Sequence, residues 1–422
     1  MPVLIAETDL SSLAAKVVAG ERLTPEDGLR LSGCRDIHEI GRLADLVRRR
    51  LHGDAAYYNV NRHINYTNSC VLRCKFCSFY RSFPVTRSGR RGSGRGVPGK
   101  RSGAPVGRAL PTAAPPSPAP APHPSDAYEL SVDDIVRLAQ EAYNAGATEV
   151  HIVGGLHPKL PFAYYLDMLC AIRAACPRIC IKAFTAVEII HFTRIARPRL
   201  GVPEVLEQLR AAGLDCLPGG GAEIFDDRVH NEAYRAKVGE QGWFDVHRVA
   251  HELGISTNAT MLYGHLETPA ERITHLVKLR EHQDESLRSR RAAFNCFVPL
   301  PFIPEGSELA HLPGPTGLDD LRTLAISRLM LDNIPHLKAF WIMQSPKLAQ
   351  VPLSWGVDDL DGTVVQYDIT KREGRTGSRH QELTIEQLCR LVQEAGFTPV
   401  ERDSFYRPIR REGATWEVAD PA

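Results

Sequence analysis

The amino-acid sequence predicts an α/β protein built on a TIM-type (β/α) barrel, and three observations support this fold class. Strand-like and helix-like segments alternate along most of the chain, the pattern of a parallel sheet. The 422 residues, 43% of them hydrophobic, are enough to bury a large core. Polar and glycine-rich stretches follow the strands, at the end where barrels carry their functional sites.

Seven strands are expected from β-branched or apolar runs that end at glycine or polar residues. They are 61–69, 149–155, 179–189, 214–224, 256–265, 292–302 and 337–344. Helical spacing of apolar residues predicts helices after these strands. They are 163–176, 203–213, 243–254, 269–283 and 317–333, with Pro269 suited to a first helical turn.

The barrel is expected at residues 57–345, between two other regions. Residues 1–56 predict an N-terminal helical cap, with one helix starting at Thr24 and another at 37–51. Residues 346–422 form a C-terminal extension with a helix at 384–397. An insertion at 87–126 holds nine Pro, seven Gly and no aromatic residue, so we expect it to be disordered.

Charge and hydropathy narrow the range of partners. The formal net charge is +1, but the insertion carries +6, which leaves an acidic remainder and argues against nucleic acid as a partner. No apolar run approaches the roughly 20 residues of a membrane helix, so the protein is not expected to be membrane-integral. The N-terminus lacks a secretory pattern, and we expect a cytoplasmic enzyme.

Three cysteines lie within eight residues in "NSCVLRCKFCSFYR": Cys70, Cys74 and Cys77, on the loop that leaves the first predicted strand. A structural zinc site takes four ligands, and no second pair of ligands matches. A disulfide framework fits neither the compartment nor the odd number. A [4Fe-4S] cluster normally takes four thiolates, so three would leave one iron open for a substrate or cofactor. Cys176 and Cys180 have no further ligand close by and are not expected to form a second metal site.

The spacing C-x3-C-x2-C, with Phe76 before the third cysteine, resembles the signature of radical S-adenosylmethionine (SAM) enzymes. The resemblance implies a partial or full (β/α) barrel and a [4Fe-4S] cluster held by Cys70, Cys74 and Cys77. It also implies that SAM binds the open iron through its amino and carboxylate groups. Reduction then releases a 5′-deoxyadenosyl radical.

Longer stretches resemble the aminodeoxyfutalosine synthases of the futalosine route to menaquinone. Among them are "EVHIVGGLHPKLPFAYYLDML", "IKAFTAVEI", "GLDCLPGGGAEIF" and "TNATMLYGHLETPAERI". The resemblance implies that the adenosyl radical adds to 3-[(1-carboxyvinyl)oxy]benzoate, giving 6-amino-6-deoxyfutalosine, methionine and CO2 or bicarbonate. SAM would be consumed, and a flavodoxin or ferredoxin would supply the electron. Two alternatives stay open: the sibling cyclic dehypoxanthinyl futalosine synthase, and a non-catalytic iron–sulfur or zinc protein.

The resemblance also suggests cofactor contacts, although it assigns no catalytic side chain. Phe76 would pack beside the cluster or the adenine. Gly154 and Gly155 would bring backbone close to the methionine amino group, and Glu188 would bind the ribose or that amine. Gly220, within a run of three glycines, would leave room for the cofactor.

The implied substrate carries two carboxylates, so cationic or hydrogen-bond donor groups are expected in its half of the site. Arg62, His63 and Asn65, on the first predicted strand, are selected from a wider group of candidates near strand ends that also includes Asn68, His157 and His265.

Overall fold

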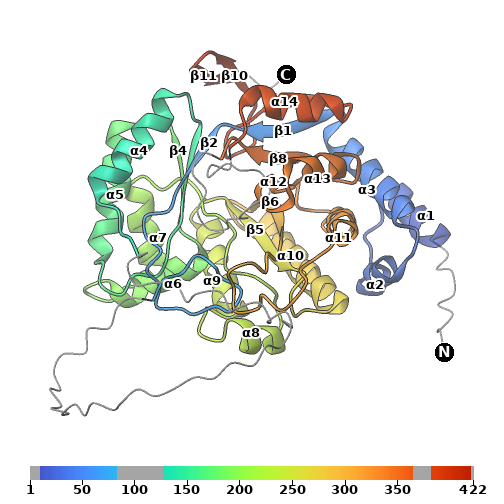
Figure 1. Cartoon of the computed structure of the whole chain (residues 1–422), viewed down its shortest axis with the longest axis horizontal. Coiled ribbons are helices and arrows are strands. Elements are labelled where there is room, and N and C mark those ends of the chain that lie inside the picture. The colour runs from blue at the N-terminus through green and yellow to red at the C-terminus, as the bar shows by residue number, and fades with distance from the viewer. Residues whose placement is uncertain (1–9, 83–126, 365–381, 420–422) are drawn as a thin grey trace, which may run out of the picture.

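The computed structural model describes residues 10–82, 127–364 and 382–419. The insertion at 87–126, predicted to be disordered, lies outside the described residues. The described chain forms a ring of parallel strands surrounded by helices, with an N-terminal helical layer on one side (Figure 1). The predicted fold class is confirmed.

The strands close into a barrel. They are β1 Ala55–Asn59, β2 Asn61–Ile64, β3 Glu149–Ile152, β4 Cys180–Ala183, β5 Thr257–Tyr263, β6 Phe294–Pro301, β7 His336–Leu337 and β8 Asp359–Gly362. Parallel pairing runs β2–β3–β4 and β5–β6–β7, and β8 pairs with β1, which continues into β2. Single bridges join the remaining gaps: Lys182 to Cys216, Leu217 to Thr257 and Lys338 to Asp359.

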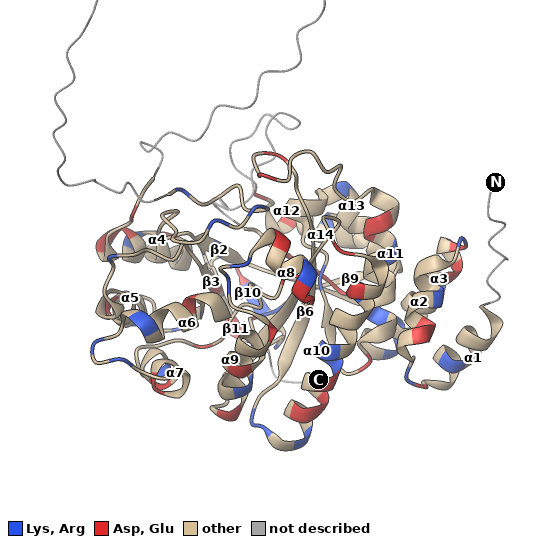
Figure 2. Ribbon diagram, turned by 90° about the horizontal axis from the view of Figure 1, so that it is seen from below, with Lys and Arg blue, Asp and Glu red and all other residues tan. Residues whose placement is uncertain are grey.

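The helices cover the outside of this ring. They are α1 Ser11–Ala19, α2 Pro25–Gly33, α3 Ile37–His52, α4 Val132–Asn144, α5 Phe162–Ala175, α6 Ala186–Ile195, α7 Val202–Ala211, α8 Asp227–Ala233, α9 Glu240–Glu252, α10 Pro269–Ser289, α11 Gly317–Met330, α12 Trp341–Gln344, α13 Pro346–Gln350 and α14 Ile385–Glu394. In Figure 1, α1–α3 pack beside α10 and α11, and α4–α7 cover the opposite side. Basic and acidic residues are interspersed on the outer helices (Figure 2).

Local sequence explains where several helices begin. Thr268 caps α10, accepting a hydrogen bond from the Glu271 N–H while the Glu271 carboxylate accepts from the Thr268 N–H, and Pro269 occupies the first turn. Ser131 and Asp134 form the same reciprocal cap on α4. These caps satisfy backbone donors that a helix start leaves without intrahelical partners.

Several parts of the barrel differ from the sequence-based prediction. The strand predicted at 179–189 ends at Ala183, because α6 begins at Ala186, and the strand predicted at 214–224 forms only single bridges at Cys216 and Leu217. The strand predicted at 337–344 is wrong beyond Leu337, because Trp341–Gln344 turn into helix α12, where the Trp341 indole donates to the Gly362 carbonyl at 2.9 Å. The strand β8 has the sequence "DLDG", which carries no β-branched signal. Its charges are buried because Asp359 accepts from Arg402 at 2.6 Å and Asp361 accepts from Lys338 at 2.7 Å.

The C-terminal region contributes to the barrel as well. The strand β9, Thr398–Glu401, adds to the outer edge of β1, and β10 Ile409–Glu412 pairs with β11 Thr415–Val418 as a hairpin. Within the described residues, no helix combines the length and hydropathy needed to cross a membrane.

Candidate functional site

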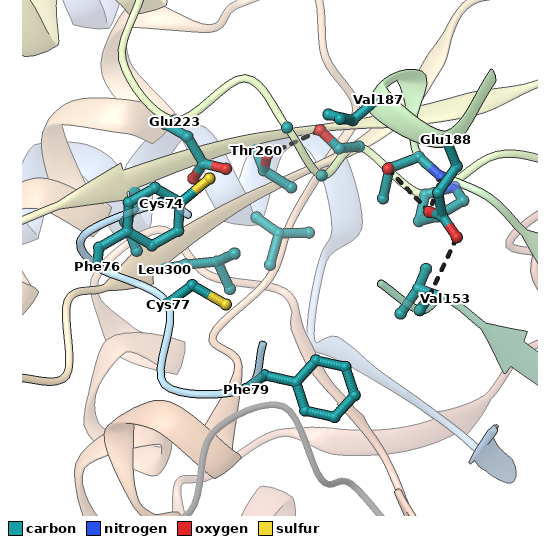
Figure 3. Close-up of a pocket in the computed structure, with 18 of the residues that line it drawn as sticks. Cys74, Phe76, Cys77, Phe79, Val153, Val187, Glu188, Glu223, Thr260 and Leu300 are labelled. Atoms are coloured by element: carbon teal, nitrogen blue, oxygen red, sulfur yellow. Dashed lines mark hydrogen bonds between the residues drawn. The ribbon is translucent and has the colours of Figure 1, made fainter. Parts of the chain in front are cut away.

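A cavity of about 330 Å³ opens at the carboxyl ends of the strands. All three cysteines of the sequence motif line it, together with Phe76, the glycines Gly154 and Gly155, Glu188 and the run Gly219–Gly221. Figure 3 shows Cys74, Cys77 and Phe76 on one side of this space and Glu188 on the other. The structure therefore places nine of the eleven residues predicted from the sequence around this cavity, His63 included.

The cysteine loop is held at both ends by backbone hydrogen bonds. At its base, the Cys70 N–H donates to the Arg81 carbonyl at 3.1 Å, and the Arg81 N–H donates to the Asn68 carbonyl at 2.8 Å. At its tip, the Lys75 N–H donates to Ala233 at the end of α8 at 2.9 Å. The loop is thus fixed to the barrel before any ligand binds, which favours a preorganised site.

The three cysteines are partly or fully buried as thiols, and binding of positively charged iron would convert them to thiolates. Burial raises the pKa of Cys70 and Cys77, and raises the pKa of the Cys74 thiol to about 12. The Cys70 sulfur accepts hydrogen bonds from the backbone N–H groups of Leu72 at 3.4 Å and Leu156 at 3.3 Å. Metal ligation requires thiolates, and bound cations deprotonate coordinating thiols outright. Three sulfurs in one cavity, with backbone donors at Cys70 and Cys77, fit an iron–sulfur cluster.

Gly154 and Gly155 have no side chain, and other residues of this chain pack directly against their backbone. A Cβ on Gly155 would lie 2.4 Å from the Ser69 carbonyl oxygen, and one on Gly154 would lie 2.6 Å from the Tyr66 ring. The glycine pair therefore lets the base of the cysteine loop pack directly on the end of β3. This contact links the two halves of the predicted cofactor site.

Glu188 lines the cavity but is already a hydrogen-bond acceptor for four protein donors. These are the Tyr66 hydroxyl at 2.7 Å, the Gly154 N–H at 3.1 Å, and the N–H and hydroxyl of Thr185 at 2.7 and 2.9 Å. Burial raises the pKa of Glu188, although these donors oppose that rise. The carboxylate therefore fixes the end of β3 and the start of α6 beside the cysteines.

The glycine run after residue 217 is packed tightly against neighbouring elements. A Cβ on Gly219 would lie 2.6 Å from the Asn258 carbonyl, and one on Gly220 would lie 2.9 Å from the Thr185 side chain. Gly221 has a φ of +101°, which disfavours any residue with a side chain. The run keeps this wall of the cavity thin, which leaves space for a ligand.

Phe76 lies against protein groups that the sequence did not indicate. Its ring packs edge-on against Tyr234 with centroids 5.7 Å apart, and the Lys237 ammonium lies 5.2 Å from its centroid. Lys237 also forms an ion pair with Glu223, and both line the cavity. Burial opposes the charge of Lys237, but Glu223 beside it raises the pKa of that lysine.

The three predicted substrate residues separate in the structure. Arg62 points outward to α4, where it donates to the Glu141 carboxylate at 3.0 Å. Asn65 donates to the Val153 carbonyl at 3.0 Å and is not among the residues that line the cavity. His63 does line it, stacked on His151 with ring centroids 4.4 Å apart.

Two lysines at the floor of the cavity were missed by the sequence analysis. Lys182 comes from β4, and Lys338 comes from the segment just after β7. A lysine inside a predicted barrel strand is the signal that could have found Lys182, because buried lysines require a partner or a function. The same signal applied to Lys338, which lies inside the strand predicted at 337–344.

Comparison with known proteins gives the class to which this fold and cysteine site belong. The family model "Radical SAM superfamily" matches residues 64–279, and the model "CofH/MqnC C-terminal region" matches residues 291–413. The chain belongs to the radical SAM superfamily. This family implies a [4Fe-4S] cluster and SAM.

Full-length relatives narrow the assignment. Aminodeoxyfutalosine synthase from Thermus thermophilus is 44% identical over 96% of this chain and 97% of its own length. The enzyme of that name from Streptomyces coelicolor is 39% identical over 97% and 95%. Within the superfamily, the chain therefore belongs to the aminodeoxyfutalosine synthase family, whose members are transferase-type enzymes of the futalosine pathway.

Other similarities are more distant. A 5-amino-6-(D-ribitylamino)uracil–L-tyrosine 4-hydroxyphenyl transferase from Methanopyrus kandleri is 33% identical over 96% of this chain and 98% of its own length. The crystal structure of methylornithine synthase (PylB) superposes with a TM-score of 0.64, covering 92% of this chain and 97% of that chain, at 16% identity. The likeness to that structure supports the barrel fold.

Proposed function

We propose that this chain joins the 5′-deoxyadenosyl group of SAM to 3-[(1-carboxyvinyl)oxy]benzoate, giving 6-amino-6-deoxyfutalosine, methionine and CO2 or bicarbonate. The observation that carries the proposal is the 44% identity to an aminodeoxyfutalosine synthase along nearly the whole of both chains. Identity falls to 33% for the relative that is named for a different transfer.

Cys70, Cys74 and Cys77 are the proposed ligands of the cluster, because all three line one cavity at the mouth of the barrel. When bound and reduced, the cluster supplies the electron that splits SAM into methionine and the adenosyl radical. A small electron carrier such as a flavodoxin or ferredoxin is the proposed donor.

The chain's own contribution is to position the alkene and exclude water. Leu262, Val298, Leu300, Phe302 and Ile303 form an apolar wall below the cysteine loop. A primary radical attacks most nearby C–H bonds, so the vinyl carbon must be at near-attack distance before SAM is cleaved. A closely packed apolar wall holds the ether in one place and keeps competing reactants out.

Anaerobic turnover of the reconstituted, reduced protein tests this function. The protein receives SAM with either the enolpyruvyl benzoate ether or dehypoxanthine futalosine, and the products are identified by mass spectrometry. The proposal predicts an adenosine-containing adduct with the ether. Free 5′-deoxyadenosine and a cyclised product with the second substrate would instead identify the cyclase.

A third reaction mixture, with L-tyrosine and 5-amino-6-(D-ribitylamino)uracil, tests the activity named for the 33% identical relative. No SAM cleavage with any substrate, in protein whose cluster is intact, would overturn the substrate assignment.

A further inference from the structure

We propose that Lys182 and Lys338 form an anion site at the floor of the cavity and bind the ring carboxylate of the aryl substrate. The inference deepens the proposed function and rests on it for the identity of the ligand. It assigns the residues that select a benzoate over a neutral aryl ether.

The barrel register places the floor residues side by side. His63 on β2 pairs with His151 on β3, and His151 pairs with Lys182 on β4. Residues in register on neighbouring parallel strands point to the same face, and all three line the cavity. Lys338 completes the floor from the segment after β7.

Lys182 can bind a ligand without releasing its internal partner. It is buried and donates to Glu149 at 2.6 Å, while Glu149 also accepts from the Ser404 hydroxyl at 2.5 Å. Lys182 lines the cavity and Glu149 does not, so the carboxylate contacts the ammonium from outside the lining of the cavity. An ammonium has three N–H donors, so Lys182 can donate to Glu149 and to a ligand carboxylate together.

Lys338 has a similar arrangement on the opposite side of the floor. It donates to Asp361 at 2.7 Å, and Asp359 lies 3.9 Å away. Asp361 also lines the cavity, so its negative charge offsets the attraction of Lys338 for an anionic ligand. The partner of Lys182, Glu149, does not line the cavity. We therefore expect Lys182 to contribute more than Lys338 to carboxylate binding.

The walls above the floor match an aromatic ring. Val298, Leu300, Leu262, Phe340 and Met343 supply apolar surface between the lysines and the cysteine loop. The cysteines follow the carboxyl end of β2, whereas His63 lies within that strand. A benzoate whose carboxylate lies on the floor therefore directs its ether substituent toward the cysteines.

Charge complementarity gives the site its selectivity. A carboxylate buried without a cationic partner is strongly disfavoured, whereas charge-assisted hydrogen bonds are about twice as strong as neutral ones. A neutral amide of the same shape cannot form these charge-assisted hydrogen bonds with the lysines. The floor should therefore prefer a benzoate to a benzamide.

The test compares binding of 3-methoxybenzoate and 3-methoxybenzamide to the reconstituted protein by isothermal titration calorimetry. Two variants replace each ion pair as a unit, so that no buried charge is left unpaired: Lys182→Met with Glu149→Gln, and Lys338→Met with Asp361→Asn. The matched control is Arg411→Met with Glu401→Gln, which neutralises a buried pair outside the cavity. Circular dichroism and thermal unfolding establish that each variant is folded.

The wild type and the control should bind the benzoate at least about 10-fold more tightly than the amide, as expected for hydrogen bonds to a charged group. The Lys182 variant should lose this preference, and the Lys338 variant should lose part of it. If one of the two double variants does not fold, the benzoate preference of the wild type and of the other variant still tests whether the lysines bind the carboxylate. A folded Lys182 variant that keeps the full preference would overturn the inference.

Turnover separates this inference from the proposed function. In the folded Lys182 variant, the KM for the enolpyruvyl ether should rise by at least about 10-fold, and in the folded Lys338 variant by less, while the KM for SAM stays near the wild-type value in both. Wild-type turnover together with an unchanged preference in both variants would reject the anion site and keep the function. A benzoate preference that disappears in the Lys182 variant, without turnover of the ether, would reject the function and keep an aryl carboxylate site. A wild type with neither turnover nor preference would reject both.

Discussion

The two ends of the barrel use buried charged and polar groups in opposite ways. At the amino-terminal end, Arg328 donates to Asp358 at 2.5 Å and to the carbonyls of Gly356 and Pro335 at 2.7 and 3.0 Å. Asp358 also accepts from the Leu337 N–H at 2.8 Å and contacts His336 at 2.6 Å. At the carboxyl-terminal end, the thiols and lysines line a cavity instead.

This difference shows that the same degree of burial can serve two purposes. Burial opposes the charge of Asp358, yet His336 and Arg328 hold the pKa of its carboxyl well below the usual value. Burial raises the pKa of the three thiols, because it disfavours the charged thiolate form. A positively charged ligand would stabilise the thiolates. The first end stabilises the fold, and the second is prepared for chemistry.

The largest expected effect is at the cysteine end. Cys74→Ala should abolish turnover and the iron content that depends on three ligands, because two thiolates hold a cluster poorly. Folding should change little, since the change removes a single sulfur. Iron analysis and anaerobic turnover measure the effect, with Cys170→Ala, an exposed cysteine on α5, as the control. Full iron content in the Cys74 variant would contradict the ligand assignment.

The next effect is at the opposite end. Arg328→Met should reduce the free energy of unfolding by about 3–5 kcal/mol, because it leaves the buried Asp358 without its guanidinium partner. Denaturant unfolding measures the loss, and Arg328→Met with Asp358→Asn should recover part of it. The benzoate preference of the folded fraction should be unchanged. A variant as stable as the wild type would show that this buried ion pair does not stabilise the fold.

Glu188, which lines the cavity but is held by protein donors, should show a smaller effect on both stability and cofactor binding. Glu188→Gln replaces an acceptor of four hydrogen bonds with a group that offers one acceptor oxygen, and should cost about 1–3 kcal/mol of stability. Because Gly154 and the cysteine loop pack together, we also expect a raised KM for SAM. Unfolding experiments and SAM titration measure the two changes. An unchanged KM for SAM would limit Glu188 to a structural role.

Stability should also fall in mild acid, through histidines buried on the side of the barrel. Burial lowers the pKa of His251 to about 2 and that of His275 and His282 to about 3. His275 already accepts from the Phe225 N–H at 3.2 Å through Nδ1 and lies 2.9 Å from the Thr260 carbonyl through Nε2, an arrangement that suits the neutral ring.

The direction follows from proton uptake. Below the ordinary histidine pKa of about 6.5, the unfolded chain binds protons that the folded chain excludes, so the free energy of unfolding falls with falling pH. The limit is about 1.4 kcal/mol per pH unit for each histidine, and stability is fully present above that pKa. Urea unfolding between pH 5 and 7.5 measures the slope. The comparison variant is His275→Gln, which should show a smaller slope of unfolding free energy against pH. A wild-type free energy of unfolding that does not change with pH would contradict this prediction.

The sequence predicted the regular part of the barrel because its strands carry apolar patterns and end at glycines. It also predicted the cysteine loop, because three thiols at that spacing have few other uses. The strand β8 could not be predicted, since Asp359 and Asp361 are tolerated in a buried strand only through Arg402 and Lys338, which lie far away in the sequence.

The candidate site shows the same limit. Arg62 and Asn65 lie next to His63 in the chain, yet alternation along β2 and the turn after it direct them away from the cavity. The two floor lysines are more than 150 residues apart in the sequence, and only the closed barrel brings them together. Local patterns thus predicted the ligand loop, while the substrate side required the fold.

The most direct test of the central claim follows the adenosyl carbon. The reconstituted, reduced protein is given SAM labelled with ¹³C at C5′ together with the enolpyruvyl benzoate ether, and the products are analysed by mass spectrometry and NMR. The account predicts that the label forms a new carbon–carbon bond in the adduct, with one methionine released for each adduct formed. Label recovered only in free 5′-deoxyadenosine, while the ether is consumed, would contradict radical addition.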